Sequence, residues 1–371
     1  MTKKEVLEIR KQFTITNCTI SKICGCYVDE EKQIILKFNN PFLSLPEEQE
    51  FKYLDIFQKV LSGKLNKNLL NVTYRTEEEV PDSAHSLLMD LTKSRLADDA
   101  LLEEFYEKIL ESYAYTGRYL ILLVHGAYDV PGKASEGSIM EDASEQVYEH
   151  ILCGICPVDL SDAGLCVNME DTSVEARIRD WIVKLPMHGF LFPAFNDRAS
   201  DIHGALFYTK KDTDLQEIFT HNVLGSENVT SGSVQKDFFK ETLTDALHNT
   251  SGYKVMQEIQ ATVRDKIEET DDAVPAFSRK DCMDILSGAG ISDEMLAQTG
   301  EAFDQSFGEK GHVLADSLTE ITKTTIEVGA LKISVPEEME RQMEVVEVNG
   351  RKCIAIFPDG PITVNGVETH I

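Results

Sequence analysis

The chain has 371 residues, of which 42% are hydrophobic and 27% are charged. This length suggests two or three domains, and the composition is that of a folded soluble protein, which excludes a disordered chain, a collagen-like fibre and a small disulfide scaffold. The 64 Asp and Glu residues outnumber the 36 Lys and Arg residues, so the net charge is -28. The average surface of so acidic a chain repels nucleic-acid phosphates and anionic membranes.

Targeting and membrane signals are not evident in the sequence. The two lysines within residues 1–8 are not followed by an apolar stretch, which a secretory signal requires. The strongest apolar run, residues 119–124, is far shorter than the ~20 residues of a membrane helix. Eight cysteines are ordinary usage for free thiols in a reducing compartment. We therefore expect a cytoplasmic protein with no membrane segment.

The first part of the chain predicts a small sheet with helices. Two β-rich runs at 18–28 and 33–38 flank a polar turn, which is typical of a hairpin. Pro46 and the glutamates behind it begin a helix whose apolar residues recur at helical spacing. A short strand and two further helices are then expected at 69–74, 82–96 and 98–115.

Residues 118–128 form the strongest strand candidate, because the run is apolar on both faces of an extended chain. Further strands are expected at 147–158, 181–185, 189–195 and 202–209. Since their connections are short, they favour an antiparallel sheet over parallel strands joined by crossover helices.

The character of the chain changes after residue 210. Helices are expected at 214–224, 235–247, 255–268, 279–286 and 292–303, with an acidic linker at 268–275. Strands return at 330–335, 343–348, 352–357 and 362–367. Asn349–Gly350, Asp359–Gly360 and Asn365–Gly366 are typical hairpin turns among these strands.

These elements together predict an α+β fold with a mainly antiparallel sheet, a helical middle and a small C-terminal β unit. The expected domains are an α+β sheet-containing domain over 1–210, a helical region over 211–323 and a β-hairpin unit over 324–371.

Two close pairs of cysteines raise the question of a metal site. Cys24 and Cys26 lie on one face of an extended strand, whereas Cys153 and Cys156 point to opposite faces. Zinc knuckles place their cysteines on turns, but both pairs lie inside apolar runs. The pattern favours buried core cysteines over structural zinc or thiol chemistry, and no cofactor is expected.

The polar segment 196–203 lies between two predicted core strands, at a sheet rim where active sites are often built. Asp197, Asp201 and His203 are candidate catalytic residues that would ligate a divalent metal, or Asp201 would orient His203 as a general base. His125 and Asp129 are the natural partners of such a site. The alternative interpretation is that the Asn and Asp side chains stabilise turns and that Arg198 pairs with a carboxylate.

Basic and aromatic residues interleave in one part of the chain, between residues 177 and 211. Such interleaving is typical of a patch that binds nucleic acid or an acidic partner, although solvated strand edges give the same pattern. The candidate binding residues are Arg177, Arg179, Trp181, Arg198, Lys210 and Lys211.

Standard catalytic signatures are missing from the sequence. It contains no Walker phosphate loop, Gly-X-Gly-X-X-Gly motif, His-Glu-X-X-His motif or Gly-X-Ser-X-Gly elbow. The sequence therefore gives no indication of a nucleotide-binding protein, a zinc protease or an α/β-hydrolase of the common kinds.

Several strings resemble a bacterial family of unknown function, the domain-of-unknown-function family numbered forty-three seventeen, and point to clostridial-type bacteria. The strings are ICGCYV at 23–28, DDALLEEFY at 98–106, YLILL at 119–123, ILC at 151–153, IRDW at 178–181 and GFLFPAFNDR at 189–198. The likeness spans essentially the whole chain and implies no activity, because the family is uncharacterised.

The order of elements is also similar, more remotely, to that of the bacterial nucleoid-associated protein family. FTHNVLG at 219–225 and GALKISV at 329–335 carry this likeness. The resemblance implies association with the nucleoid and with other proteins, and it transfers no catalytic residue.

We therefore expect an interaction protein, nucleoid-associated and binding DNA or DNA-bound proteins, rather than an enzyme. The alternative is a metal-assisted hydrolase built on Asp197, Asp201 and His203. A third interpretation is a homodimer whose C-terminal hairpins pair between chains.

Overall fold

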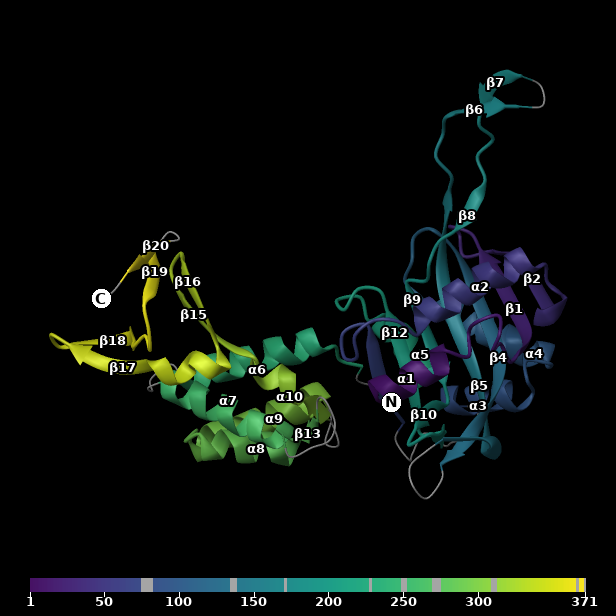
Figure 1. The fold of residues 1–371 in the computed structure, drawn as a ribbon. Helices are drawn as coiled ribbons and strands as arrows, with labels where there is room; N and C mark the ends of the chain where they lie inside the picture. The colour runs from purple at the N-terminus through teal and green to yellow at the C-terminus, as the bar shows by residue number, and fades with distance from the viewer. Residues whose placement is uncertain are drawn as a thin grey trace. The chain divides into compact units, whose positions relative to one another are not determined.

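The computed structural model describes residues 1–74, 83–133, 139–169, 172–226, 229–247, 252–268, 275–307, 312–364 and 367–369. It divides the chain into two compact units, Met1–Val234 and Gln235–Ile371. The fold is α+β with a mainly antiparallel sheet, as the sequence predicted (Figure 1).

The first unit is built on an eight-stranded sheet in which all neighbouring strands pair antiparallel. Seven strands follow the order β2-β1-β4-β5-β9-β12-β3, and β8 pairs with β5 beside this path. The strands are β1 (Ile20–Val28), β2 (Ile34–Pro41), β3 (Leu69–Thr73), β4 (Arg118–Lys133), β5 (Ile139–Leu160), β8 (Trp181–Val183), β9 (His188–Phe192) and β12 (Gly204–Thr209).

Helices cover both faces of this sheet. One layer contains α1 (Lys3–Arg10) and α2 (Glu47–Val60); the other contains α3 (Ala84–Lys93), α4 (Asp99–Ser112) and α5 (Glu217–Leu224). Because successive residues of a strand point to opposite faces, Ile121 and Leu123 of β4 join the core under α3–α5, and Leu122 joins the core under α1 and α2. Each such side chain contributes about 1.5–3 kcal/mol of burial energy.

The start of α4 is determined by a local capping residue, and its end by a contact with the sheet. The carboxylate of Asp98 accepts hydrogen bonds from the backbone N–H groups of Ala100 (2.9 Å) and Leu101, which fixes the start of α4. The helix ends earlier than the predicted residue 115, because Tyr113 adopts an extended backbone conformation and its hydroxyl reaches His188 in the sheet.

The rest of the first unit consists of short elements. The predicted strand over 189–195 is divided at Pro193, which has no N–H to donate to a strand ladder. These elements are the 3-10 helix η1 (Phe42–Ser44) and strands β6 (Leu165–Asn168), β7 (Ser173–Ala176), β10 (Ala194–Asn196) and β11 (Ala199–Asp201).

The second unit contains a helical core followed by three hairpins. Phe239, Ile259, Val263 and Phe303 are fully buried in that core. Its elements are α6 (Gly232–Leu247), α7 (Gly252–Glu268), β13 (Ala276–Ser278), α8 (Arg279–Gly288), α9 (Asp293–Phe307), β14 (His312–Leu314) and α10 (Ala315–Leu318).

The three C-terminal hairpins each form a separate two-stranded sheet. They are β15 (Lys323–Val328) with β16 (Leu331–Pro336), β17 (Met343–Val348) with β18 (Arg351–Ile356), and β19 (Ile362–Val364) with β20 (Val367–Thr369), and η3 (Glu337–Gln342) separates the first two. Asn349 and Gly350 both have positive φ, 53° and 73°, so the predicted turn between β17 and β18 is confirmed.

The unit boundary falls later than the residue 210 expected from the sequence. Phe219, Val223 and Leu224 of α5 belong to the core under the first unit's sheet, so this helix is part of that unit. The helical region and the hairpins, expected as separate domains, lie in one compact unit. Residues 269–274 of the expected acidic linker and the Asn365–Gly366 turn lie outside the described residues.

Among the residues described, there is no helix of the length and apolar character needed to cross a membrane.

His150 is completely enclosed by the core under α1 and α2. Its ring stacks on Tyr148 with centroids 4.7 Å apart, and a Cβ atom at Gly126 on the neighbouring strand would lie 2.9 Å from its Nε2 atom. The close approach therefore requires glycine at position 126. Burial lowers the pKa of His150 to about 3, so the ring is neutral in the folded protein.

This histidine makes stability depend on pH. Between pH 6.5 and the lowered folded pKa, the unfolded chain binds a proton that the folded chain does not, so stability falls as the pH decreases, by about 1.4 kcal/mol per pH unit. The free energy of unfolding, measured with urea at pH 7.5 and at pH 5.0, should therefore fall between these pH values by about 2 kcal/mol less in His150→Gln than in the wild type. The exposed His221→Gln is the matched control. Equal pH dependence in His150→Gln and the wild type would contradict the assignment.

Candidate functional site

A hairpin arm extends from the sheet between β5 and β8, over residues 161–180 (Figure 1). Its base is fixed by Ser161 and Asp180: the N–H of Ser161 donates to the carbonyl of Asp180 (2.8 Å), and the N–H of Asp180 donates to the Ser161 hydroxyl (3.0 Å). Ser161 is buried. The arm is thus an extension of the central strand β5 with an ordered base.

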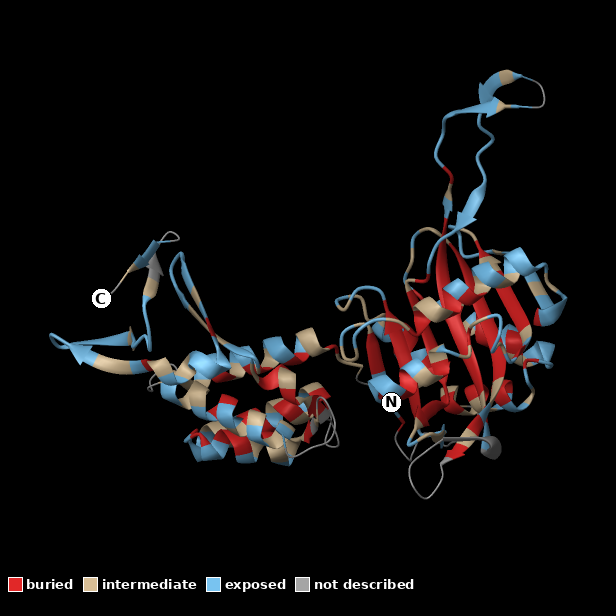
Figure 2. Ribbon diagram, in the orientation of Figure 1, coloured by how far each residue is buried: buried red, intermediate tan, exposed pale blue. Residues whose placement is uncertain are grey.

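The tip of the arm, formed by β6 and β7, has one apolar and one polar face. Directly opposite residues share a face, so Leu165, Val167, Val174 and Ala176 lie together. The other face carries Cys166, Asn168, Ser173 and Glu175. The apolar face is open to solvent, with Leu165 exposed by 76%, Val167 by 67% and Val174 by 62% (Figure 2).

Exposed apolar side chains grouped in this way are characteristic of an interaction surface. A two-stranded hairpin has too little apolar contact to be stable alone in water. Met169 and Ile178, exposed by 82% and 85%, extend the apolar character along the arm. The arm therefore presents apolar side chains to solvent along much of its length.

At the base of the arm, Trp181 is half exposed beside a cation that is already paired. The guanidinium of Arg118 lies 4.0 Å from the Trp181 ring centroid, and its Nε donates to Glu30 (2.8 Å). The contact with Glu30 raises the pKa of Arg118. Because this charge is neutralised within the unit, the Trp181 surface is more apolar than basic.

The predicted basic binding residues do not form one surface. Arg177 and Arg179 lie in the arm and Trp181 in β8, level with Leu160 of β5. Lys210 and Lys211 follow the last residue of β12, Thr209. This residue pairs with His188 of β9, which in turn pairs with Ile155 of β5. Arg179 is also engaged, because its Nε donates to the Ser161 carbonyl (2.7 Å).

Arg198 lies toward the opposite end of the sheet. Its carbonyl accepts a hydrogen bond from Gln146 of β5 (2.7 Å). Residues 146 and 160 of one strand are roughly 45 Å apart at the usual rise per residue. The Arg198 guanidinium is paired with Glu8 (2.9 Å), as the alternative interpretation expected.

The polar segment 196–203 forms a tight hairpin. Asp197 and Arg198 both have positive φ, 51° and 58°, and connect β10 to β11. The carboxylate of Asp201 accepts from the Asn196 side chain (2.6 Å) and from the N–H of His203 (3.0 Å). Asp201 thus stabilises the turn, and its two oxygens already have partners.

Metal-ligating groups do not gather in the part of the chain that the structure describes, where no three His, Cys, Asp or Glu side chains are arranged to hold an ion. His125, suggested as a partner, instead lies 3.2 Å from the Ser21 hydroxyl through Nδ1 and 3.9 Å from Glu149 through Nε2. Glu149 is paired with Arg95. Burial lowers the pKa of His125. Asp129 lies in β4 opposite Val147.

The close cysteine pairs are core residues. Cys24, Cys26 and Cys153 face the core under α3–α5, and Cys156 faces the core under α1 and α2, as the strand alternation predicted. Burial raises the pKa of Cys24 to about 11 and that of Cys26 to about 12. These thiols are protonated and enclosed, which does not favour thiolate chemistry.

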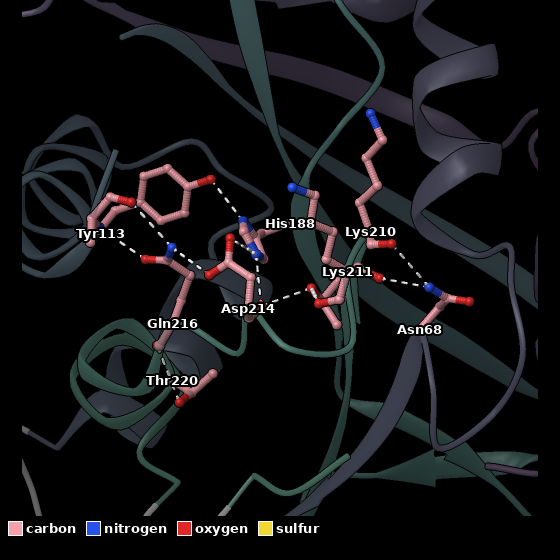
Figure 3. A network of polar contacts seen from close by, with 10 residues as sticks. Asn68, Tyr113, His188, Lys210, Lys211, Asp214, Gln216 and Thr220 are labelled. Carbon is pink, nitrogen blue, oxygen red and sulfur yellow. Dashed lines mark hydrogen bonds and ion pairs between the residues drawn. The ribbon is translucent and has the colours of Figure 1, made fainter. Parts of the chain in front are cut away.

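A polar network that the sequence did not reveal surrounds His188 at the start of β9 (Figure 3). The ring nitrogen Nδ1 lies 2.7 Å from the Tyr113 hydroxyl, and Nε2 lies 3.0 Å from the Asp214 carbonyl and 3.6 Å from its carboxylate. The Gln216 amide donates to the Asp214 carboxylate (2.9 Å) and exchanges two hydrogen bonds with the backbone of Ala114.

The Tyr113 and His188 side chains of this network are enclosed in the core. His188 is buried, burial lowers its pKa, and burial likewise raises the pKa of Tyr113. The network connects the end of α4, the start of β9 and the start of α5. The three residues come from distant parts of the sequence, so no local spacing could have indicated them.

Removing the Tyr113 hydroxyl should destabilise the protein. Tyr113→Phe leaves a buried nitrogen of His188 without its partner, which costs about 1–3 kcal/mol of unfolding free energy. Tyr119→Phe is the matched control, because the buried Tyr119 hydroxyl has no hydrogen-bond partner in the described structure. The free energy of unfolding is measured with urea for both variants. An equal loss in Tyr113→Phe and Tyr119→Phe would contradict a stabilising hydrogen bond between Tyr113 and His188.

The model of the family described as Domain of unknown function (DUF4317) matches residues 1–367. The chain therefore belongs to this family, as its sequence strings suggested. No curated protein matches it.

Proposed function

We propose that this protein is a cytoplasmic interaction protein, not an enzyme, and that it binds a protein partner through the apolar face of its arm. The observation that carries the proposal is the solvent exposure of Leu165, Val167 and Val174 on one face of the β6–β7 hairpin.

The charge of the chain indicates the chemistry of the partner. A net charge of -28 attracts basic surfaces and accelerates encounters with them. A partner with an apolar centre and a basic rim would cover the arm and complement the acidic body. If the protein acts at the nucleoid, as the remote family resemblance implies, this chemistry favours DNA-bound basic proteins over DNA itself.

Direct DNA binding has little support in the described structure. Specific and non-specific contacts to DNA both depend on clustered Lys and Arg side chains. Here Arg118 and Arg198 are paired with glutamates, and the candidate basic residues are spread along the sheet. The metal-assisted hydrolase is the weaker alternative, because the Asp201 carboxylate is used within its turn.

A matched pair of arm variants tests the main proposal. Val167→Asp places a charge on the apolar face, and Cys166→Asp places the same charge on the polar face of the same strand. We expect a labelled peptide of alternating lysine and valine to bind the wild type and Cys166→Asp. Its affinity for Val167→Asp should be about tenfold lower, since losing the burial of one valine costs about 1.5 kcal/mol.

Fluorescence anisotropy measures this binding, with a labelled mixed-sequence DNA duplex titrated in parallel. Equal peptide binding by all three proteins would reject the arm as the site. Duplex binding that weakens steeply with salt would show instead that DNA is a direct target.

Homodimerisation is a second candidate, favoured by the C-terminal hairpins. In the hairpin β17–β18, Met343, Val345, Ile354 and Ile356 share one face, and the two isoleucines are exposed by 40% and 52%. The hairpin belongs to no larger sheet. Pairing with a second copy would bury this face.

Sedimentation equilibrium tests the dimer. We expect twice the monomer mass for the wild type and the monomer mass for Ile354→Asp/Ile356→Asp. Cys353→Asp/Ala355→Asp alters the opposite face of the same strand and should leave the dimer intact. A wild-type protein that sediments as a monomer at every concentration would exclude this assembly.

A further inference from the structure

The second unit contains an open groove of about 770 Å³. Its floor is formed by one face of α6 and one face of α7, and its wall by β15 and the segment before it. The α6 residues that line it, Lys236, Lys240, Leu243 and Leu247, follow each other by three or four positions, which is the spacing of one helical face. The volume lies within the ~300–1,000 Å³ range of small-molecule sites.

The wall of the groove is fastened to its floor. The Thr324 hydroxyl of β15 donates to Gln260 of α7 (2.9 Å), and the Gln260 amide donates to the carbonyl of Glu320 (3.1 Å). Arg264 of α7 forms two parallel hydrogen bonds with Glu340 of η3 (2.8 and 2.9 Å). Bidentate pairs of this kind are strong and directional. The groove is therefore formed before any ligand arrives.

The polar side chains in the middle of the groove are already satisfied, since Gln260 and Thr324 bond to each other and to neighbouring groups. The surfaces between them are apolar and are contributed by Leu243, Met256 and Leu318, which pack on the core of the unit. An extended peptide would bring backbone amides that need partners here. A hydrocarbon chain brings none.

The α6 side of the groove carries two cations. Lys236 and Lys240 lie one helical turn apart, where like charges repel each other. Two carboxylates, Glu320 and Glu327, line the opposite wall of the groove. Glu327 bonds to Lys332 (2.6 Å), and its pKa is lowered mainly by Lys332 and to a smaller extent by Lys240. Among the described residues, neither groove lysine forms an ion pair. In a chain of net charge -28, this pair of ammonium groups beside an apolar surface is suited to one anionic head group.

We propose that this groove binds an amphiphilic carboxylic acid of the fatty-acid class. The carboxylate lies between Lys236 and Lys240, and the hydrocarbon chain covers Leu243, Met256 and Leu318. The site is independent of the arm, and so of the function proposed above.

Fluorescence titration with dansyl-labelled undecanoic acid tests the proposal on the full chain. We expect saturable binding by the wild type, and binding at least about tenfold weaker in Lys236→Gln/Lys240→Gln, because charge-assisted hydrogen bonds to the carboxylate are lost. Lys254→Gln/Lys280→Gln removes the same charge outside the groove and should bind as the wild type does. Val167→Asp in the arm should also bind normally.

The methyl ester of the same probe separates charge from hydrocarbon. It should bind the wild type and Lys236→Gln/Lys240→Gln with equal, reduced affinity, and Met256→Asp should weaken the binding of both probes. Circular dichroism confirms that each variant is folded, and Met256→Gln replaces Met256→Asp if the latter is not. Absence of saturable binding, equal binding of acid and ester by the wild type, or equal acid binding by the two lysine variants would overturn the proposal.

Discussion

The long antiparallel pair of β4 and β5 is the feature on which the first unit depends. Residues 118–133 of one strand pair along residues 139–158 of the other, and the fully buried residues of both strands contribute to cores on the two faces of the sheet. A sheet that is apolar on both faces must be covered twice. This requirement explains the helical layers on both faces.

Polar groups inside this frame serve the packing. His150 stacks on Tyr148, and His188 bonds to Tyr113 and to the backbone of Asp214. Burial lowers the pKa of both histidines, that of His150 to about 3. General-base chemistry near neutral pH needs a pKa near the working pH and access to substrate. The enclosed ring of His150, whose pKa is about 3, meets neither condition.

Local patterns were enough to predict much of the fold. Two-sided apolar character identified β4, Asp98 marked the start of α4, and alternation assigned Cys153 and Cys156 to opposite cores. The helix α1 could also have been found, because Thr2 and Glu5 form a capping box. What local patterns could not give was proximity. Arg198 and Trp181 are close in sequence, yet the strand pairing carries them to opposite ends of β5, whereas Tyr113 and His188 meet across 75 positions.

The same physical problem recurs at the arm and at the C-terminal hairpins. An isolated hairpin has two faces and no layer of helices to cover either one. The alternation of apolar and polar residues along its strands, which would build a core in a covered sheet, therefore presents apolar side chains to solvent. Val167 opposite Val174 is one instance, and Val345 opposite Ile354 is another. Contact between such apolar surfaces and water is unfavourable. The arm and the β17–β18 hairpin therefore expose apolar side chains for the same geometric reason, namely that no second layer packs on a face of a two-stranded sheet in the described structure.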